Sequence, residues 1–388
     1  HTDDLETTVS SVRELLEDIV QRQLISDVPV CALLSGGLDS SAITALAAHR
    51  LAAQGRGALR SFALDFAGYA DNFTPDGMRD TADSPFARAL AAHVGAEHTE
   101  VVLSQADLID HASRATVARA IDSPPLGGDK FTSLYLMCAA IRPHFTVALS
   151  GQGADSVFGG SNWFQAADAD TFPWLADIPI WLSAQLAPGG SSLFSDDFLA
   201  VLDIQGYQRD CYAAALAEVP HTGGASQTER RQRAVNYLCL TRDLLQDLEG
   251  PERMSMANGV EIRVPFCDHR LVQYLFNTPW SFKAFDGREK SLLRAAVSDL
   301  LPESIRSRRK SPYPATQDPG YELTLRDELG KLLSDGISPV LDLLDAERTR
   351  TLLNRPVPAV SVDITRLLLE AVLGLDTWLS VTGARIDL

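Results

Sequence analysis

Residues 28 to 51 of this chain, VPVCALLSGGLDSSAITALAAHRL, contain the pattern that decides the fold. Val28 to Leu34 form an unbroken apolar run of strand length, which is typical of strands buried on both faces of a parallel sheet. A turn rich in glycine and serine follows, and the segment Ser41 to Leu51 predicts a helix. The stretch therefore predicts a buried strand that a tight turn joins to a helix.

The same alternation extends on both sides of this stretch. Leu5 to Leu24 places its apolar residues on one helical face. Further strands are predicted at 61–66, 99–103 and 145–149, and further helices at 84–94, 108–120 and 132–141. Alternating strands and helices predict an α/β fold with a doubly wound parallel sheet.

This α/β core is predicted to occupy residues 1–160. Residues 161–388 are predicted to be a mostly helical portion of the same domain, because helical periodicity dominates from 236 onward. Polar segments predict loops at 281–290 and 307–320.

Composition narrows the class of protein. Thirty-four Lys and Arg against 51 Asp and Glu give a net charge of −17. Nucleic-acid binding and polybasic membrane contacts both need clustered positive charge, so we expect neither kind of partner. No apolar run reaches the roughly 18 residues of a membrane helix. Five cysteines without a CxxC pair predict buried thiols and a cytoplasmic location.

The turn Ser35-Gly36-Gly37-Leu38-Asp39-Ser40-Ser41 lies between the buried strand and its helix. Glycines permit a close backbone approach, and the helix start presents free N–H groups to an anion. The turn lacks the Lys of a Walker motif and the spacing of GxGxxG. Asp39 would repel a phosphate unless a magnesium ion lay between them, so the turn predicts a magnesium–phosphate site.

A second turn of the same kind is Ser150-Gly151-Gln152-Gly153-Ala154-Asp155, again directly after an apolar strand. Two such turns at the ends of two parallel strands would hold one magnesium pyrophosphate between them. A purely structural turn would not need the second acid.

Four motifs together carry a resemblance. SGGLDSS at 35–41, SGQGADSVFGG at 150–160, RVPFCD at 263–268 and KSLLR at 290–294 occur in this order. With these motifs the chain resembles the synthetase domain of asparagine synthetases over nearly its whole length. The first motif alone would fit any PP-loop ATP pyrophosphatase, including tRNA-thiolating enzymes. The later three narrow the resemblance to the asparagine synthetase class, which also contains β-lactam synthetases and lasso-peptide cyclases.

The resemblance implies a ligase that uses ATP and magnesium. A substrate carboxylate, aspartate or an analogue, would attack the α-phosphorus of ATP to give an acyl-adenylate and pyrophosphate. Ammonia or an amine would then displace AMP and form an amide. Asp39 and Asp155 are implied to hold magnesium, and Lys290 to neutralise charge on the pyrophosphate. The implied nucleotide contacts are Leu33, Ser35, Gly36, Gly37, Asp39, Ser40, Leu64, Ser150, Gly151 and Asp155.

The resemblance also implies catalytic roles for Lys290, Gln152 and Arg263. From the residues alone, Lys290 would be a solvated lysine in a polar loop, and Arg263 a member of an ion pair with Glu261.

Three further positions match the family less closely. Asp122 and Tyr135 lie near positions of the family's substrate pocket, with a structural role equally open for each. His98 matches a recurring family position, where a structural role is the expectation.

The sequence departs from the family at Gln152, where asparagine synthetases usually carry Glu and β-lactam synthetases Tyr. Gln can form hydrogen bonds but cannot take a proton from an attacking ammonium. Ser156 replaces a second common acid. We expect ATP binding to survive both changes. For the amide step three options stay open: a nucleophile that is already neutral, another residue as base, or a catalytically weakened relative.

Glutamine-using members of the family carry a glutaminase domain ahead of the synthetase domain, with Cys as its N-terminal nucleophile. This chain begins at His1, and none of its five cysteines is placed for that role. Either ammonia or an amine arrives directly, or the glutaminase portion is a separate or removed segment. The linker-like stretch His1-Thr2-Asp3-Asp4 favours the second option, so we expect a glutaminase portion as a partner. A natural-product tailoring amide or lactam synthetase is the alternative within the class, whereas the charge of −17 disfavours tRNA thiolation.

Overall fold

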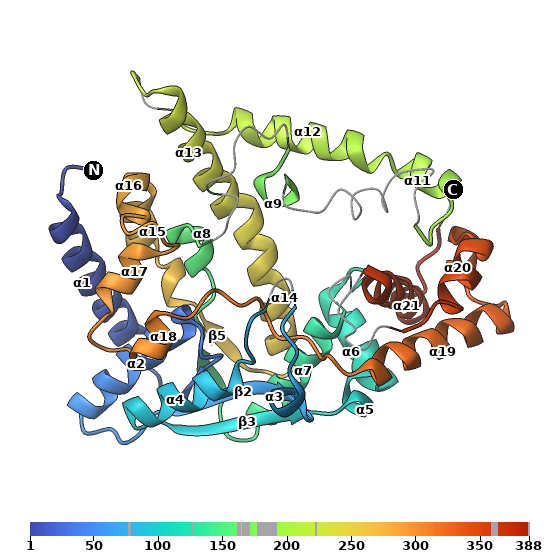
Figure 1. The fold of residues 1–388 in the computed structure, drawn as a ribbon, viewed down its shortest axis with the longest axis horizontal. Coiled ribbons are helices and arrows are strands. Elements are labelled where there is room, and N and C mark those ends of the chain that lie inside the picture. The colour runs from blue at the N-terminus through green and yellow to red at the C-terminus, as the bar shows by residue number, and fades with distance from the viewer. Residues whose placement is uncertain are drawn as a thin grey trace.

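The structure is a computed structural model that describes residues 1–76, 79–125, 128–160, 164, 171–176, 192–221, 223–357 and 364–386. Five strands form an all-parallel sheet in the order β3-β2-β1-β4-β5 (Figure 1). The strands are β1 (Val30–Leu33), β2 (Arg60–Phe66), β3 (Glu97–Leu103), β4 (Val147–Leu149) and β5 (Glu261–Arg263). The predicted α/β fold with a parallel sheet is confirmed.

Strand β1 lies at the centre of the sheet, with β2 on one side and β4 on the other. Its Leu33 pairs with Phe62 of β2, and its Ala32 pairs with Leu149 of β4. Because β2 and β4 flank β1 on opposite sides, the connections diverge where these strands end. In doubly wound sheets a crevice opens at that switch point.

Helices cover both faces of the sheet, as alternation of the strand residues requires. Ala32 and Leu149 point into one core, and their neighbours Cys31 and Ala148 point into the other. The first core contains residues of α1 (Leu5–Gln23), α2 (Leu38–Ala53), α4 (Ser84–Val94), α15 (His269–Phe276) and α17 (Ser291–Ala296). The second contains residues of α6 (His111–Ile121), α7 (Asp129–Ile141), α14 (Leu244–Met256), α19 (Pro319–Asp335) and α21 (Ile364–Thr382).

Shorter helices and an upper layer complete the described chain. Helices α12 (Ile204–Ala217) and α13 (Gln227–Leu238) lie above the sheet in Figure 1 and lead down into α14. The remaining α-helices are α3 (Tyr69–Asn72), α5 (Gln105–Leu108), α8 (Ala154–Phe158), α9 (Pro173–Ala176), α11 (Asp196–Leu202), α16 (Trp280–Lys283), α18 (Glu303–Arg306) and α20 (Ala346–Leu353). A π-helix, Cys239–Asp243, joins α13 to α14.

The second half of the chain is mostly helical, as predicted, but it also supplies β5 to the sheet. This three-residue edge strand gives no periodic signal in the sequence, and its first residue, Glu261, is exposed. Several boundaries also differ from prediction: the predicted helix 108–120, for example, is divided into α5 (Gln105–Leu108) and α6. Helix α2 begins at Leu38 rather than Ser41, and the predicted loop 281–290 begins inside helix α16.

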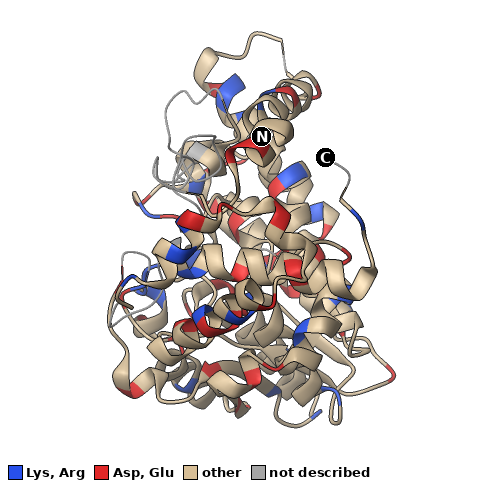
Figure 2. Cartoon of the chain, turned by 90° about the vertical axis from the view of Figure 1, so that its right-hand side faces the viewer, with Lys and Arg blue, Asp and Glu red and all other residues tan. Residues whose placement is uncertain are grey.

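The cysteine thiols are buried or partly buried, and charges of both signs are mixed over the chain (Figure 2). None of the five cysteines, all of them described, forms a disulfide, and Cys31, Cys138 and Cys239 are buried. Lys and Arg lie scattered among the Asp and Glu residues (Figure 2). Among the described residues, none of the helices combines the length and apolar content that crossing a bilayer requires.

Candidate active site

The first turn closes the carboxyl end of β1 and starts helix α2. Gly36 has a φ of +73°, and a Cβ there would lie 2.6 Å from the Cβ of Phe86, so only glycine fits. The Ser35 and Ser40 hydroxyl oxygens lie 3.0 Å apart and fold the turn back on the helix start. Gly37 caps α2 without a side chain, which leaves the first N–H groups of the helix open to an anion.

The second turn follows β4 and packs directly on the first. A Cβ on Gly151 would lie 2.5 Å from the backbone nitrogen of Ser40 and 2.7 Å from the carbonyl carbon of Asp39. The missing side chain therefore allows the two turns to touch. The structure thus brings the two Ser/Gly/Asp turns to one place, at the switch point of the sheet.

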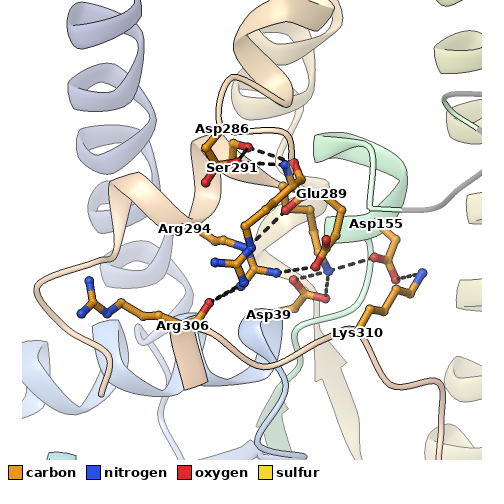
Figure 3. Close-up of polar contacts among 10 residues, drawn as sticks. Asp39, Asp155, Asp286, Glu289, Ser291, Arg294, Arg306 and Lys310 are labelled. Carbon is orange, nitrogen blue, oxygen red and sulfur yellow. Dashed lines mark hydrogen bonds and ion pairs between the residues drawn. The ribbon is translucent and has the colours of Figure 1, made fainter. Parts of the chain in front are cut away.

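Lys290 joins the two turns electrostatically. Its Nζ lies 2.7 Å from Oδ2 and 2.8 Å from Oδ1 of Asp39, and 2.9 Å from Oδ1 of Asp155. Figure 3 labels these two aspartates, which approach the same point from different elements. The side chain is only 3% exposed. Burial alone would lower the pKa of Lys290, but the two carboxylates raise it above its ordinary value, so the ammonium stays charged. The expectation of a solvated surface lysine is therefore wrong.

The loop before α17 fixes the position of Lys290. Lys290 has a φ of +53°, a left-handed conformation that costs a non-glycine residue about 1–2 kcal/mol. Arg294, which is 7% exposed, is paired with Glu289 and also donates to the carbonyl of Arg306 (Figure 3). A Cβ on Gly160 would lie 2.1 Å from Asp155 Oδ1 and 2.9 Å from Lys290 Cδ, so glycine leaves the room that the ion pair needs.

A cavity of about 280 Å³ opens where the two turns meet. Ten of the predicted residues line it: Leu33, Ser35, Gly37, Asp39, Ser40, Leu64, Ser150, Gly151, Gln152 and Asp155. Leu33 and Leu64 belong to adjacent strands and form an apolar wall, together with Leu134 and Met137 of α7. A polar floor beside an apolar wall suits a nucleotide, whose phosphates and base need opposite surroundings.

Sequence reasoning missed the three basic residues of the cavity lining, Lys130, Arg308 and Lys310, of which the last two belong to one loop. Arg308 pairs with Asp83 at 2.6 Å, and its guanidinium stacks 4.1 Å above the Phe86 ring. Lys310 lies 3.1 Å from Asp155. The signal was the basic run Arg306 to Lys310 inside the predicted polar loop, but nothing in the sequence places that loop over the phosphate turns.

Gln152 lines the cavity as part of the second turn. Its Nε2 donates to the backbone carbonyl of Asp247 at 3.3 Å. Asp247 also lines the cavity and lies 3.7 Å from Lys130. Two ion pairs thus line the cavity, Lys130 with Asp247 and Arg308 with Asp83, and in each pair the two charges offset each other.

Arg263 is not brought to the cavity. Its Nε lies 2.7 Å from Glu261, and its Nη1 donates to the backbone carbonyls of Gln23 and Ile25. This arrangement fits the ion pair that the residues alone suggest. The Arg263 backbone does reach the second turn, because its carbonyl accepts the N–H of Ser150 at 2.8 Å.

The three loosely matched residues also lie outside the cavity lining. His98 shares a 2.9 Å hydrogen bond with Ser61 across β2 and β3, and burial lowers its pKa. Asp122 has a left-handed φ of +56° at the end of α6. Tyr135 lies on α7 and packs at the edge of the second core. These placements are those of structural residues.

The acidic residues fit a magnesium ion only together with a nucleotide. Asp39 and Asp155 offer the hard oxygen ligands that Mg²⁺ prefers. Within the described part of the chain, no three His, Cys, Asp or Glu side chains gather to hold a metal ion alone. Lys290 and Lys310 already balance the two carboxylates, so a triphosphate would bring uncompensated charge. Mg²⁺ bound by Asp39, Asp155 and phosphate oxygens would supply the missing positive charge.

Comparison with known proteins agrees with this geometry. The family model described as asparagine synthase matches residues 11–380. The chain is 38% identical to asparagine synthetase [glutamine-hydrolyzing] 3 of Bacillus subtilis (strain 168) over 354 residues, which cover 91% of this chain and 56% of that protein. It is 26% identical to asparagine synthetase [glutamine-hydrolyzing] 1 of the same organism, over 79% of this chain and 49% of the relative. Asparagine synthetase [glutamine-hydrolyzing] of Gallus gallus is 26% identical, over 80% of this chain and 44% of the relative.

The chain therefore spans about half the length of the curated relatives that it matches. The family match covers both turns, the Lys290 loop and the helices behind them. On this evidence, the chain belongs to the asparagine synthase family.

Proposed function

We propose that this chain is the ATP-using synthetase portion of a carbon–nitrogen ligase that releases AMP and pyrophosphate. The substrate is a small carboxylate, aspartate or an analogue, which becomes activated as an acyl-adenylate. Ammonia or an amine then forms the amide. The observation that carries the proposal is the buried Lys290 ammonium between Asp39 and Asp155, at the meeting point of two phosphate-type turns.

The residues divide the work between binding and charge stabilisation. The N–H groups at the start of α2 and the hydroxyls of Ser35 and Ser40 hold the β- and γ-phosphates. Lys290 stabilises negative charge that grows on pyrophosphate as it leaves, and its burial strengthens that interaction. Asp39 and Asp155 would hold magnesium, which would supply positive charge against the triphosphate.

Gln152 bears on the second step. Its amide can orient a nucleophile but cannot remove a proton from ammonium. We propose that the nucleophile arrives as neutral ammonia, supplied by a glutaminase portion of the kind that the names of the relatives indicate. A tailoring amide or lactam synthetase is the second candidate, because the same substitution would also suit a neutral amine.

The test is to incubate the chain with MgCl₂, ATP, aspartate and ammonium and to identify the products by ³¹P NMR and amino-acid analysis. Aspartate-dependent AMP and pyrophosphate, with asparagine, support the proposal. Hydroxylamine in place of ammonium traps an activated carboxylate as a hydroxamate, which separates activation from amide formation. ADP with orthophosphate would overturn the proposed chemistry.

A further inference from the structure

One wall of the cavity is a loop, residues 307–318, that connects α18 to α19. Its Arg308, Lys310 and Tyr313 line the cavity. Both ends of the loop are held by buried charges. At the first end, Arg308 is paired with Asp83. At the far end, the backbone N–H of Thr316 donates to Asp129 Oδ2 at 3.0 Å.

Arg366 of α21 is the centre of the far anchor. Its guanidinium pairs with Asp129 at 2.7 Å and Glu370 at 3.0 Å, and it donates to the carbonyl of Thr316. It also stacks 4.6 Å above the ring of Tyr321. Arg366 is 2% exposed, Glu370 4% and Asp129 5%. A buried arginine that binds two carboxylates and one loop carbonyl fixes all three in one geometry.

The same anchor aligns the loop with the opposite wall. Asp129 is the first residue of α7, and the following residues Lys130, Leu134 and Met137 line the cavity. Between them, the hydroxyls of Ser133 and Tyr313 lie 3.2 Å apart. Arg366 thus acts on two cavity walls at once, although it contributes no atom to the lining.

We infer that Arg366 is a positioning residue, which holds the 307–318 loop against α7 and so keeps Arg308 and Lys310 over the nucleotide cavity. The expected effect on the kinetics with ATP rests on the proposed function. The attachment of the loop to α7 does not rest on it, and proteolysis tests that attachment separately.

Arg326 provides a matched control. It is 8% exposed, its guanidinium pairs with Glu322 four residues away on the same helix, and it donates to the carbonyls of Leu352 and Arg355. Like Arg366, it is a buried helical arginine that pairs with a glutamate four residues away and donates to backbone carbonyl oxygen. Its contacts run to Glu322 on its own helix, to Leu352 of α20 and to Arg355 just after α20, rather than to the cavity loop. Loss of Arg326 therefore reports what a buried arginine does for stability alone.

The first experiment is limited trypsin digestion of the native full chain, because Arg306, Arg308, Arg309 and Lys310 are cleavage sites within the loop region. At a temperature where both variants keep native circular dichroism, Arg366→Gln should accelerate cleavage at 306–310 by about tenfold or more, since cleavage follows the population of the open loop. Arg326→Gln should change that rate by less than about twofold. Equal rates in the two variants would overturn the inference.

A second variant covers the case that Arg366→Gln does not fold. Arg366→Lys keeps the charge, but one ammonium cannot reproduce the fork that reaches Asp129 and Thr316 together. It should accelerate loop cleavage by about threefold to tenfold, and an unchanged rate would contradict the inference.

The kinetic readout separates this inference from the proposed function. Arg366→Gln should raise the KM for ATP about tenfold while the kcat of pyrophosphate release falls less, because the loop's cations are displaced rather than removed. Arg326→Gln should leave both unchanged. If Arg366→Gln accelerates loop cleavage selectively but the parent chain releases no pyrophosphate, the proposed function is rejected and the anchor is kept. If the parent chain releases pyrophosphate but Arg366→Gln and Arg326→Gln are cleaved equally fast, the anchor is rejected and the proposed function is kept.

Discussion

Two lysines at either end of one loop, Lys283 and Lys290, are equally buried but differ in electrostatic surroundings. They are 2% and 3% exposed. Lys283 donates to the backbone carbonyl of Val157 at 3.2 Å, and burial lowers its pKa to about 7. Burial opposes the charge of Lys290 as well, but Asp39 and Asp155 raise its pKa above the ordinary value. A buried lysine thus stays fully charged here only where carboxylates surround it.

The difference follows from which element each lysine faces. Val157 belongs to α8, the helix that also carries Asp155, so both lysines support the second turn. Lys283 supports it through a neutral carbonyl, and Lys290 through a carboxylate that lines the cavity. We therefore assign Lys283 to the structure of the helix and Lys290 to the chemistry. The following predictions test that assignment.

The largest effect is expected for Lys290→Met. Removal of the buried cation takes away charge stabilisation at the leaving pyrophosphate, and we expect pyrophosphate release to slow by about 100-fold to 1000-fold. Lys283→Met makes the same chemical change at equal burial, and its rate should stay within about threefold of the parent. A coupled pyrophosphate assay measures both. Equal losses of activity in the two variants would contradict the assignment of different roles to Lys283 and Lys290.

The pH dependence of the free energy of unfolding should depend on Lys283, the lysine with the smaller expected effect on activity. The folded pKa of Lys283, about 7, lies below the ordinary 10.5 of the unfolded chain. The unfolded state therefore binds more protons between these values, and this group alone makes the free energy of unfolding rise with pH, by at most about 1.4 kcal/mol per unit. Below pH 7 both states are protonated and the penalty is complete.

Lys283→Met removes that contribution. Its stability relative to the parent should be greatest near pH 7 and should diminish toward pH 10. Urea unfolding at several pH values measures the difference. A difference between variant and parent that does not change with pH would show that Lys283 is charged in the folded chain, which would remove the contrast with Lys290.

The second turn offers a smaller and more selective test at Gln152. Gln152→Glu restores a proton acceptor without changing Lys290 or the phosphate turns. At pH 7, where ammonium dominates, asparagine formation should rise about tenfold, while hydroxamate formation from neutral hydroxylamine should stay within about twofold. Equal changes in both products would mean that position 152 acts on activation, as Lys290 does, rather than on the amide step.

The sequence predicts the two turns well because each depends on local chemistry. A buried strand, a glycine with positive φ and a helix start occur within a few residues, and parallel strands bring their carboxyl ends to one edge. The sequence pattern therefore predicts that the two turns meet, and the close contact between Gly151 and Ser40 is where they do. Lys290 was identified only by resemblance, because a polar loop has no periodicity that reveals burial.

The parts that escaped prediction depend on contacts between distant segments. Arg308 and Asp83, or Arg366 and Asp129, are more than 200 residues apart and meet only through tertiary packing. Strand β5 was missed because three residues at a sheet edge leave no alternation to detect. Arg263 shows the converse: its motif marks the family, but its side chain faces away from the cavity.

Arg263 gives the last and smallest test of the comparison. Like Lys283, Arg263 donates to backbone carbonyls, those of Gln23 and Ile25. Its strand, β5, pairs with β4, the strand that leads into the second turn. Arg263→Gln should therefore lower the free energy of unfolding by about 1 kcal/mol or less, because two backbone carbonyls lose their donor but at least one of them can bind water instead. Pyrophosphate release should change by less than about twofold, since the backbone carbonyl that binds Ser150 remains. A loss of activity near that of Lys290→Met, with stability unchanged, would move Arg263 from the structural group to the catalytic one and would show that side chains behind the sheet edge reach the reacting phosphates.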